Sequence, residues 1–304
     1  MKNVVCFDVG GTFIKYAVIN SEGKILFKDK FPTPNYNCRE TIPENMINKI
    51  EEIRGSYELH AVGICTAGLV DSKNGVVIAA NNFPEYSGTR LSEAVKKGTG
   101  LNTFVENDVN AAALGEMWKG AAKGHDTFVC IALGTGVGGA VVIDGKVVKG
   151  VSGAAGEIGH IIIEEKGEQC GCGTVGCYER YASTSAFIRT YMNKALEQGM
   201  DISESEVDGE YIMKLVNSGD KLALEVYNQF LDHVVTGIVS VTHLLDPGLI
   251  VVGGGISAQG QVFFNELNNR FRKRAIKDYA EHTTIVQAQL KNDAGIYGAC
   301  YIAL

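Results

Sequence analysis

The sequence predicts an α/β protein made of two related lobes, and three observations support this fold class. A chain of 304 residues is too long for one ordinary core and suits two lobes of about 100–200 residues each. Strand patterns and helical patterns follow one another along the chain. Two segments, which begin at Val4 and Phe128, share the order strand, glycine-rich turn, strand, turn, strand.

These two segments can be aligned residue by residue. Placing Cys6 on Cys130 also places Gly10 on Gly134. Any two β-hairpins look somewhat alike, so chance similarity is one explanation. A duplicated lobe explains more, because both segments have a Gly/Thr-rich first turn and a polar second turn. We therefore expect an active-site cleft between two lobes, with one glycine turn from each lobe facing it.

The remaining patterns place helices and strands around these segments. Apolar residues at helical or strand spacing predict each element. We expect helices over residues 41–54, 91–97, 109–118, 183–197, 210–216, 221–245 and 294–303, and strands over 60–65, 102–106 and 249–252. The first lobe should comprise residues 1–118, completed by a C-terminal helix in 292–304, and the second lobe should comprise residues 119–291.

Composition and charge narrow the function classes. Hydrophobic residues make up 45% of the chain and charged residues 21%, which is typical of a soluble globular protein. The net charge of −7 argues against a nucleic-acid-binding surface, which is usually basic. The chain starts with a strand pattern rather than a signal peptide, and it has no run of about 18 apolar residues. We therefore expect a cytoplasmic protein with no membrane partner.

The two glycine turns are candidate phosphate sites. Glycines let backbone N–H groups approach a phosphate, a threonine adds a hydroxyl donor, and an aspartate at the end of the preceding strand is suited to hold Mg²⁺ through water. One such turn is a weak signal, and two in matching places are a stronger one. The candidate residues are Asp8, Gly10, Gly11, Thr12 and Lys15 in the first segment, and Gly134, Thr135, Gly136 and Gly138 in the second.

A third candidate is the sequence ENDVN, which precedes an apolar helix pattern. Asn and Asp are favoured helix N-caps, so a purely structural role is one explanation. The functional explanation is that Asp108 accepts the proton of an attacking hydroxyl while Asn107 orients the acceptor. Because a helix N-terminus stabilises a carboxylate, we expect Asp108 to have an ordinary or low pKa and to be ionised at neutral pH.

A cluster of cysteines predicts a metal site. His160, Cys170, Cys172 and Cys177 offer the Cys₃His donor set of a closed tetrahedral Zn²⁺ site, which points to a structural metal. Reduced cysteines in a flexible loop are the alternative. The metal would fix this loop so that Glu157, three residues before His160, and a second carboxylate, at residue 179, can accept hydroxyl groups.

A last glycine run follows the apolar strand over 249–252. Gly254 and Gly255 suit a nucleotide base or ribose that lies flat on backbone, although an ordinary turn between a strand and a helix is equally compatible with them.

Taken together, these motifs resemble the ROK family (repressors, uncharacterised reading frames and sugar kinases). The family has the two-lobed actin/hexokinase-like, ribonuclease H-like ATPase fold. The resemblance covers nearly the whole chain and is most specific over residues 133–179.

This resemblance implies an ATP-dependent sugar kinase that uses Mg²⁺ with ATP, carries a structural Zn²⁺ and forms a homodimer. The expected reaction transfers the γ-phosphoryl group to a hydroxyl, the 6-OH of glucose or a related hexose, with Asp108 as the general base. The residues that match the family's sugar ligands are Gly68, Asn82, Asn107, Asp108, Glu157, His160 and Glu179.

Some positions leave the acceptor open. Tyr86 and Arg90 replace a Trp and a Pro that many family glucokinases show, which puts plain glucose in doubt. Leu69 stands where the family's N-acetylmannosamine kinases tend to carry Arg. A β-glucoside (disaccharide) kinase and an N-acetylhexosamine kinase are the alternatives.

Two other classes share the glycine turns. A sugar-responsive transcriptional regulator would carry a DNA-reading module ahead of Asp8, where only seven residues precede it, so this alternative is a regulator that lacks its DNA-binding domain. An actin-like or chaperone-like ATPase would need neither the Cys₃His loop nor the ENDVN sequence.

Overall fold

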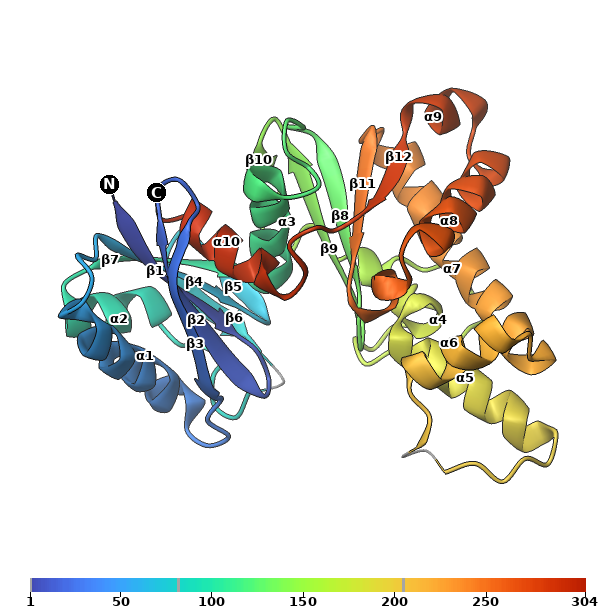
Figure 1. Ribbon diagram of the computed structural model, residues 1–304, viewed down its shortest axis with the longest axis horizontal. Helices are drawn as coiled ribbons and strands as arrows, with labels where there is room; N and C mark the ends of the chain where they lie inside the picture. Colours follow the sequence, from blue (N-terminus) through green and yellow to red (C-terminus); the bar gives the residue numbers. More distant parts are fainter. Residues whose placement is uncertain (1, 81–82, 204–205) are drawn as a thin grey trace. The chain divides into compact units, whose positions relative to one another are not determined.

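The computed structural model describes residues 2–80, 83–203 and 206–304 (Figure 1). The chain divides into two compact units. The first comprises Met1–Asp126, Val141–Ala155 and Gln289–Leu304, and the second comprises Thr127–Ala140 and Gly156–Ala288. The sequence patterns had assigned residues 119–291 to one lobe without a break, whereas Val141–Ala155 packs with the first unit.

The first unit is built on a sheet in which five strands follow the order β3-β2-β1-β4-β7. The strands are β1 (Asn3–Val9), β2 (Phe13–Asn20), β3 (Ile25–Pro32), β4 (Ala61–Thr66) and β7 (Asn102–Asn107). β1, β4 and β7 run parallel, with Val9 opposite Thr66 and Thr66 opposite Asn107. The carboxyl ends of these three strands therefore meet at one edge of the sheet, the usual place of a binding site in α/β proteins.

Helices cover both faces of this sheet, and successive apolar side chains of β1 point alternately into the two cores that result. Val5 and Phe7 belong to a core with α1 (Cys38–Arg54) and α2 (Leu91–Thr99). Val4 and Cys6 belong to the other core, with α3 (Asp108–Lys119) and α10 (Ala294–Tyr301). A small hairpin of β5 (Leu69–Asp71) and β6 (Val76–Ala79) completes this unit.

The helix α10 comes from the end of the chain and packs directly on α3 and on the central strands, beside the blue strands in Figure 1. The approach is very close at Gly298, where a Cβ atom would lie 1.7 Å from the carbonyl oxygen of Ala111. Only glycine fits there, so this position fixes how α10 sits against the helix that begins at Asp108.

The second sheet repeats the first in strand order and direction, as β10-β9-β8-β11-β12. Its strands are β8 (Phe128–Leu133), β9 (Val137–Ile143), β10 (Lys146–Val147), β11 (Leu249–Gly253) and β12 (Thr284–Gln287). As in the first sheet, a central strand has antiparallel neighbours on one side and parallel neighbours on the other. The predicted duplication is confirmed, and the two glycine turns occupy the same place, between β1 and β2 and between β8 and β9.

The helices of the second unit were predicted in part. The expected helices correspond to α5 (Thr184–Glu197), α6 (Gly209–Ser218) and α7 (Lys221–Leu245). The elements that the patterns missed are α4 (Glu179–Ala182), α8 (Gln261–Arg274), α9 (Lys277–His282) and β12. α8 buries Phe263, Phe264, Leu267 and Phe271, a helical spacing that its many polar residues conceal.

In the first unit α1 begins at Cys38, three residues earlier than the patterns predicted. The chain turns at Asn37, whose φ is 41°, and its carbonyl oxygen accepts the N–H groups of Glu40 and Thr41. Pro43 therefore lies in the second turn of the helix rather than near its start.

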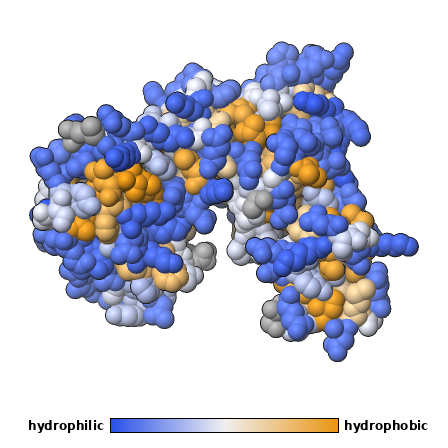
Figure 2. All heavy atoms as spheres, viewed as in Figure 1, coloured by the Kyte–Doolittle hydropathy of each residue, from blue (hydrophilic) through white to orange (hydrophobic). Residues whose placement is uncertain are grey.

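Most of the face visible in Figure 2 is hydrophilic, interrupted by several hydrophobic patches. None of the helices within the described ranges combines the length and the apolar character that crossing a membrane requires.

Candidate functional site

Each unit carries one part of the predicted site, and the part in the first unit lies at the carboxyl edge of its parallel strands. Asp8 of β1 lies opposite Lys15 of β2, and the Lys15 ammonium donates to the Asp8 carboxylate at 3.1 Å. The same ammonium donates to the carbonyl oxygen of Asn292 at 3.1 Å. Lys15 therefore balances the charge of Asp8, a role that its proposed assignment to phosphate did not include.

The first glycine turn begins two residues after Asp8, at the end of β1. Gly11 and Thr12 are exposed, and the Gly10 N–H donates to the carbonyl oxygen of Phe13 at 3.2 Å. Thr33 supports the turn from β3's end, because its hydroxyl donates to the Gly10 carbonyl oxygen at 2.6 Å. The turn thus has a defined shape and presents its tip to solvent.

Asn107 and Asp108 stand where β7 ends and α3 begins. The Asn107 side-chain oxygen accepts the N–H groups of Val109 at 2.9 Å and of Asn110 at 3.1 Å, so Asn107 is the N-cap of α3. The structural explanation of this residue is confirmed. Its side-chain amide nitrogen also donates to the Gly68 carbonyl oxygen at 3.0 Å and to Asp108 at 2.9 Å. Three of the predicted sugar-binding residues therefore lie together: Gly68, Asn107 and Asp108.

The pKa of Asp108 is raised, which corrects our expectation of an ordinary or low value. Burial of the carboxylate is the main cause, and repulsion by Asp8 adds to it. Hydrogen bonds from the Val109 N–H and the Asn107 side chain lower the pKa but do not outweigh burial. The helix N-terminus acts in the expected direction, and desolvation is the larger effect.

Glu106 is a functional candidate that the sequence patterns did not identify, although it belongs to the ENDVN sequence. It is only 4% exposed. Its carboxylate accepts from the Ser72 hydroxyl at 2.8 Å, from the Asn107 backbone N–H at 3.1 Å and from the Asn110 side chain at 3.2 Å, and it pairs with Lys149. This buried carboxylate fixes the corner from which Asp108 projects. A glutamate at an inward position of a strand was the available signal.

The part of the site in the second unit lies where the parallel strands β8 and β11 end. A Cβ atom on Gly254 would lie 2.0 Å from the Leu133 carbonyl oxygen, so the glycine run after β11 touches the start of the turn at Gly134. Thr135 is exposed at that turn's tip. The predicted phosphate residues of this unit and its predicted nucleotide residues are therefore neighbours.

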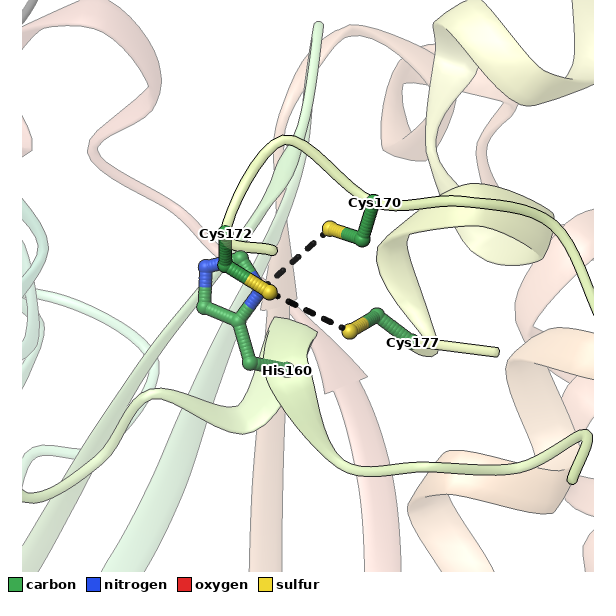
Figure 3. A group of neighbouring side chains, drawn as sticks. All are labelled: His160, Cys170, Cys172 and Cys177. Carbon is green, nitrogen blue, oxygen red and sulfur yellow. Dashed lines mark hydrogen bonds between the residues drawn. The ribbon is translucent and has the colours of Figure 1, made fainter. Parts of the chain in front are cut away.

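The Cys₃His donor set is brought together in the same unit (Figure 3). The ligand atoms of His160, Cys170, Cys172 and Cys177 all lie within 4.8 Å of one another. The Cys172 and Cys177 sulfurs are 3.5 Å apart, and the Cys170 sulfur is 3.7 Å from Nδ1 of His160. Zinc–sulfur bonds of about 2.3 Å at tetrahedral angles put sulfurs about 3.8 Å apart, so the cluster fits Zn²⁺.

The thiols of the cluster differ in their acidity. Hydrogen bonds from the backbone and side chain of Thr174 lower the pKa of the Cys172 thiol to about 6, which favours the thiolate that binds zinc. Burial raises the pKa of the Cys177 thiol to about 12, and a bound cation would offset this penalty.

The two nitrogens of the His160 ring face different neighbours. Nδ1 faces the thiols, while Nε2 lies 3.9 Å from the Glu157 carboxylate. Glu157 precedes a short 3₁₀ helix, Ile158–His160, and its side chain is exposed. A metal on Nδ1 would therefore leave Nε2 and Glu157 available for a ligand.

Glu179 is the last of the predicted sugar-binding residues. It contacts the second glycine turn and not the cysteine cluster. Its carboxylate oxygen Oε2 accepts the N–H of Val137 at 3.0 Å. The sequence contained no signal for this contact, because the two residues are far apart along the chain.

The remaining predicted positions lie elsewhere. Asn82 falls outside the described residues. Tyr86 is fully buried against Phe83, with its hydroxyl 3.4 Å from that of Thr66, and burial raises its pKa. The Arg90 side chain is exposed and pairs with Glu93. Tyr86, which stands where many family glucokinases have Trp, therefore lies in the buried core behind the carboxyl edge of the strands.

Known proteins share this architecture and up to about a third of their residues in the alignments that follow. The model of the ROK family matches residues 4–304. A glucokinase of Thermotoga maritima is 34% identical over 301 residues, covering 97% of this chain and 95% of the relative. The crystal structure of a ROK family glucokinase from Streptomyces griseus in complex with glucose and AMPPNP is 34% identical, has a TM-score of 0.83 and covers 99% of each chain.

The family also contains regulators. The xylose repressor of Bacillus subtilis is 26% identical over 305 residues, which cover 99% of this chain and 76% of the repressor. The fold is the α/β actin/hexokinase-like fold that the sequence resemblance implied. With a match along nearly its whole length, the chain belongs to the ROK family.

Proposed function

We propose that this protein is an ATP-dependent sugar kinase that phosphorylates glucose or a related hexose, with the 6-OH as acceptor. The observation that carries the proposal is the position of Asp108 beside Asn107 and Gly68, at the strand edge that also holds Asp8 and the first glycine turn. A carboxylate base, an acceptor-orienting amide and a phosphate turn are the parts that phosphoryl transfer needs.

The chain's own residues have the following roles in this proposal. Asp108 takes the proton of the attacking hydroxyl, and Asn107 with the Gly68 carbonyl orients the sugar. Glu157, His160 and Glu179 bind further hydroxyls. The glycine turns at Gly10 and Gly134 bind phosphate oxygens through backbone N–H groups, with Gly254 and Gly255 against the nucleoside.

Two metal ions have separate tasks. Asp8 would hold Mg²⁺ through water, and Mg²⁺ supplies charge neutralisation of the transferred phosphoryl group. The four residues of the Cys₃His cluster would hold Zn²⁺, whose task would be structural: to fix the loop that bears Glu157 and His160. We further propose a homodimer and a cytoplasmic location.

A screen of acceptors tests the proposal. ADP release is measured with Mg·ATP and glucose, mannose, their N-acetylated forms, fructose, allose or cellobiose. We expect at least one hexose to raise ADP release about 10²-fold or more over the sugar-free rate. Preference for an N-acetylated sugar or for cellobiose would replace the acceptor but keep the kinase.

A protein that binds sugar without releasing ADP above the sugar-free rate would contradict the proposal and favour a regulatory role. Asp201→Asn removes one carboxylate charge at an exposed position, as Asp108→Asn does at the site. It is the control for unspecific effects of an Asp108 variant.

A further inference from the structure

The Glu179 carboxylate lies inside the second glycine turn. Its Oε2 accepts the Val137 N–H at 3.0 Å, and a Cβ atom on Gly136 would lie 2.1 Å from the same oxygen. The segment after Glu179 is bonded to the other end of the turn, because the Thr184 N–H donates to the Gly134 carbonyl oxygen at 2.8 Å. The carboxylate thus fills the space that a side chain at position 136 would occupy.

Backbone N–H groups of a glycine turn are donors for anions, and the carboxylate uses one of them. A phosphate that needs the same N–H meets both an occupied donor and a negative charge. No lysine or arginine in the described part of the chain forms an ion pair with Glu179, and the neighbouring Arg180 pairs with Glu168 at 2.9 Å. The repulsion between the two anions is therefore not screened by a paired cation.

The segment before Glu179 is anchored in the core, whereas Glu179 itself is not fully buried. Cys177 and Tyr178, the two residues before it, are fully buried, and the Tyr178 hydroxyl donates to the Val234 carbonyl oxygen at 2.8 Å. The Glu179 side chain is partly exposed. A carboxylate on such a base can exchange partners by rotation of its own side chain alone.

We propose that Glu179 is an internal competitor of the nucleotide phosphate and that the acceptor sugar releases it. In the sugar-free protein the carboxylate holds the Val137 N–H and weakens nucleotide binding. A sugar hydroxyl that donates to Glu179 withdraws the carboxylate and frees the N–H for phosphate. This inference rests on the proposed function, and it makes sugar and nucleotide bind cooperatively and suppresses ATP hydrolysis without sugar.

The dissociation constant of a non-hydrolysable ATP analogue tests the inference, measured by calorimetry on the full-length, zinc-loaded protein with and without saturating sugar. In the parent, sugar should tighten nucleotide binding about tenfold. In Glu179→Gln, which removes the charge and keeps the size, sugar-free binding should tighten about three- to tenfold and the effect of sugar should fall below about twofold.

Two controls sharpen the result. Glu197→Gln makes the same charge change at an exposed position of α5 and should leave both constants as in the parent. If Glu179→Gln does not fold, as judged by its melting curve, Glu179→Ala should show the same direction of change. Sugar-free nucleotide binding that is unchanged or weaker in the folded variant would mean that Glu179 merely supports the turn, and it would overturn the inference.

The sugar-free measurement depends only on nucleotide and Glu179. Sugar phosphorylation by the parent, measured separately, decides the proposed function. A failure of one is therefore distinguishable from a failure of the other.

Discussion

The pKa of Asp108 depends on its burial, on the charge of Asp8, and on hydrogen bonds from Asn107 and from the start of α3. Burial and Asp8 raise its pKa, and the helix N-terminus with Asn107 opposes this effect. A residue pattern shows the helix N-terminus and the N-cap, but it does not show how much water reaches the carboxylate. This is why the sequence predicted the position of the candidate base and gave the wrong direction for its pKa.

Asp108→Asn should separate activity from stability. We expect kcat to fall about 10²–10⁴-fold, because the proposed proton acceptor is lost. A raised pKa means that the folded protein favours the protonated acid, a contribution that is fully present below the unfolded pKa of about 3.9 and is lost as the pH rises through the folded pKa. At pH 7 the ionised Asp108 therefore costs stability, so the Asn variant should melt at or above the parental temperature.

Steady-state rates and melting curves at pH 7 check both parts. An Asn variant that keeps the parental rate would refute the base assignment, and one that melts well below the parent would refute the energetic argument.

The same raised pKa predicts the acid limb of the activity profile. In the proposed mechanism Asp108 acts in its ionised form, so kcat should fall as the pH drops through its pKa, at a higher pH than an ordinary aspartate would give. The Asp8 charge contributes to the raised pKa of Asp108. The residual activity of Asp8→Asn should therefore fall off at a lower pH than the activity of the parent. Pre-incubation at each pH followed by assay at neutral pH separates titration from unfolding.

An acid limb at the position of a free aspartate, or one that Asp8→Asn moves to higher pH, would contradict this assignment.

At the scale of elements, strongly periodic segments were predicted well and short or polar ones were not. The predicted limits of α7 are those of the structure, because its apolar stripe is long and bounded by Asp220 and Asp246. β12 has four residues and α4 has four, too few for a period to show. The donor set of the metal loop was visible because it depends on residue type, while the contact of Glu179 with Val137 depends on packing between distant segments.

The metal loop gives a prediction for Cys172→Ser. Since Cys172 is exposed, its loss should leave the fold intact but weaken zinc binding at least about tenfold, as changes around metal ligands typically do. Elemental analysis should find about one equivalent of zinc in the parent and clearly less in the variant, and KM for sugar should rise more than KM for ATP. Lys166→Ala, an exposed change in the same loop, should alter none of these values.

Well under one equivalent of zinc in freshly purified parental protein would contradict the metal assignment, as would a Cys172→Ser protein with full zinc content.

At the scale of the whole molecule, the first unit is assembled from three separate stretches of chain. The sequence suggested that a C-terminal helix completes this lobe, yet the inclusion of Val141–Ala155 could not be predicted from a local pattern. Pairs such as Lys149 with Glu106 hold that stretch, and their partners are distant in the sequence. Such contacts are visible only when the chain is folded.

Gly298→Ala tests how far the last helix controls the site. The added methyl group would meet the Ala111 backbone, so α10 must shift or α3 must move, at a cost of about 1–3 kcal/mol. We expect a melting temperature lower by about 2–10 °C and a lower kcat, because α3 carries Asp108 at its start. Gly55→Ala, which meets nothing within 4 Å, is the matched control and should leave both values unchanged.

A Gly298→Ala protein with the stability and rate of the Gly55→Ala control would show that α10 adapts without moving α3.

The late arrival of α10 also has a consequence for biosynthesis. A ribosome that adds about 5–20 residues per second needs roughly ten to thirty seconds to travel from the end of α3 to the start of α10. During that interval the core around Val4, Cys6 and Ala111 lacks its cover. A nascent chain therefore cannot complete the core beneath α3 before the final helix has left the exit tunnel, and until then its apolar surface is a target for chaperones.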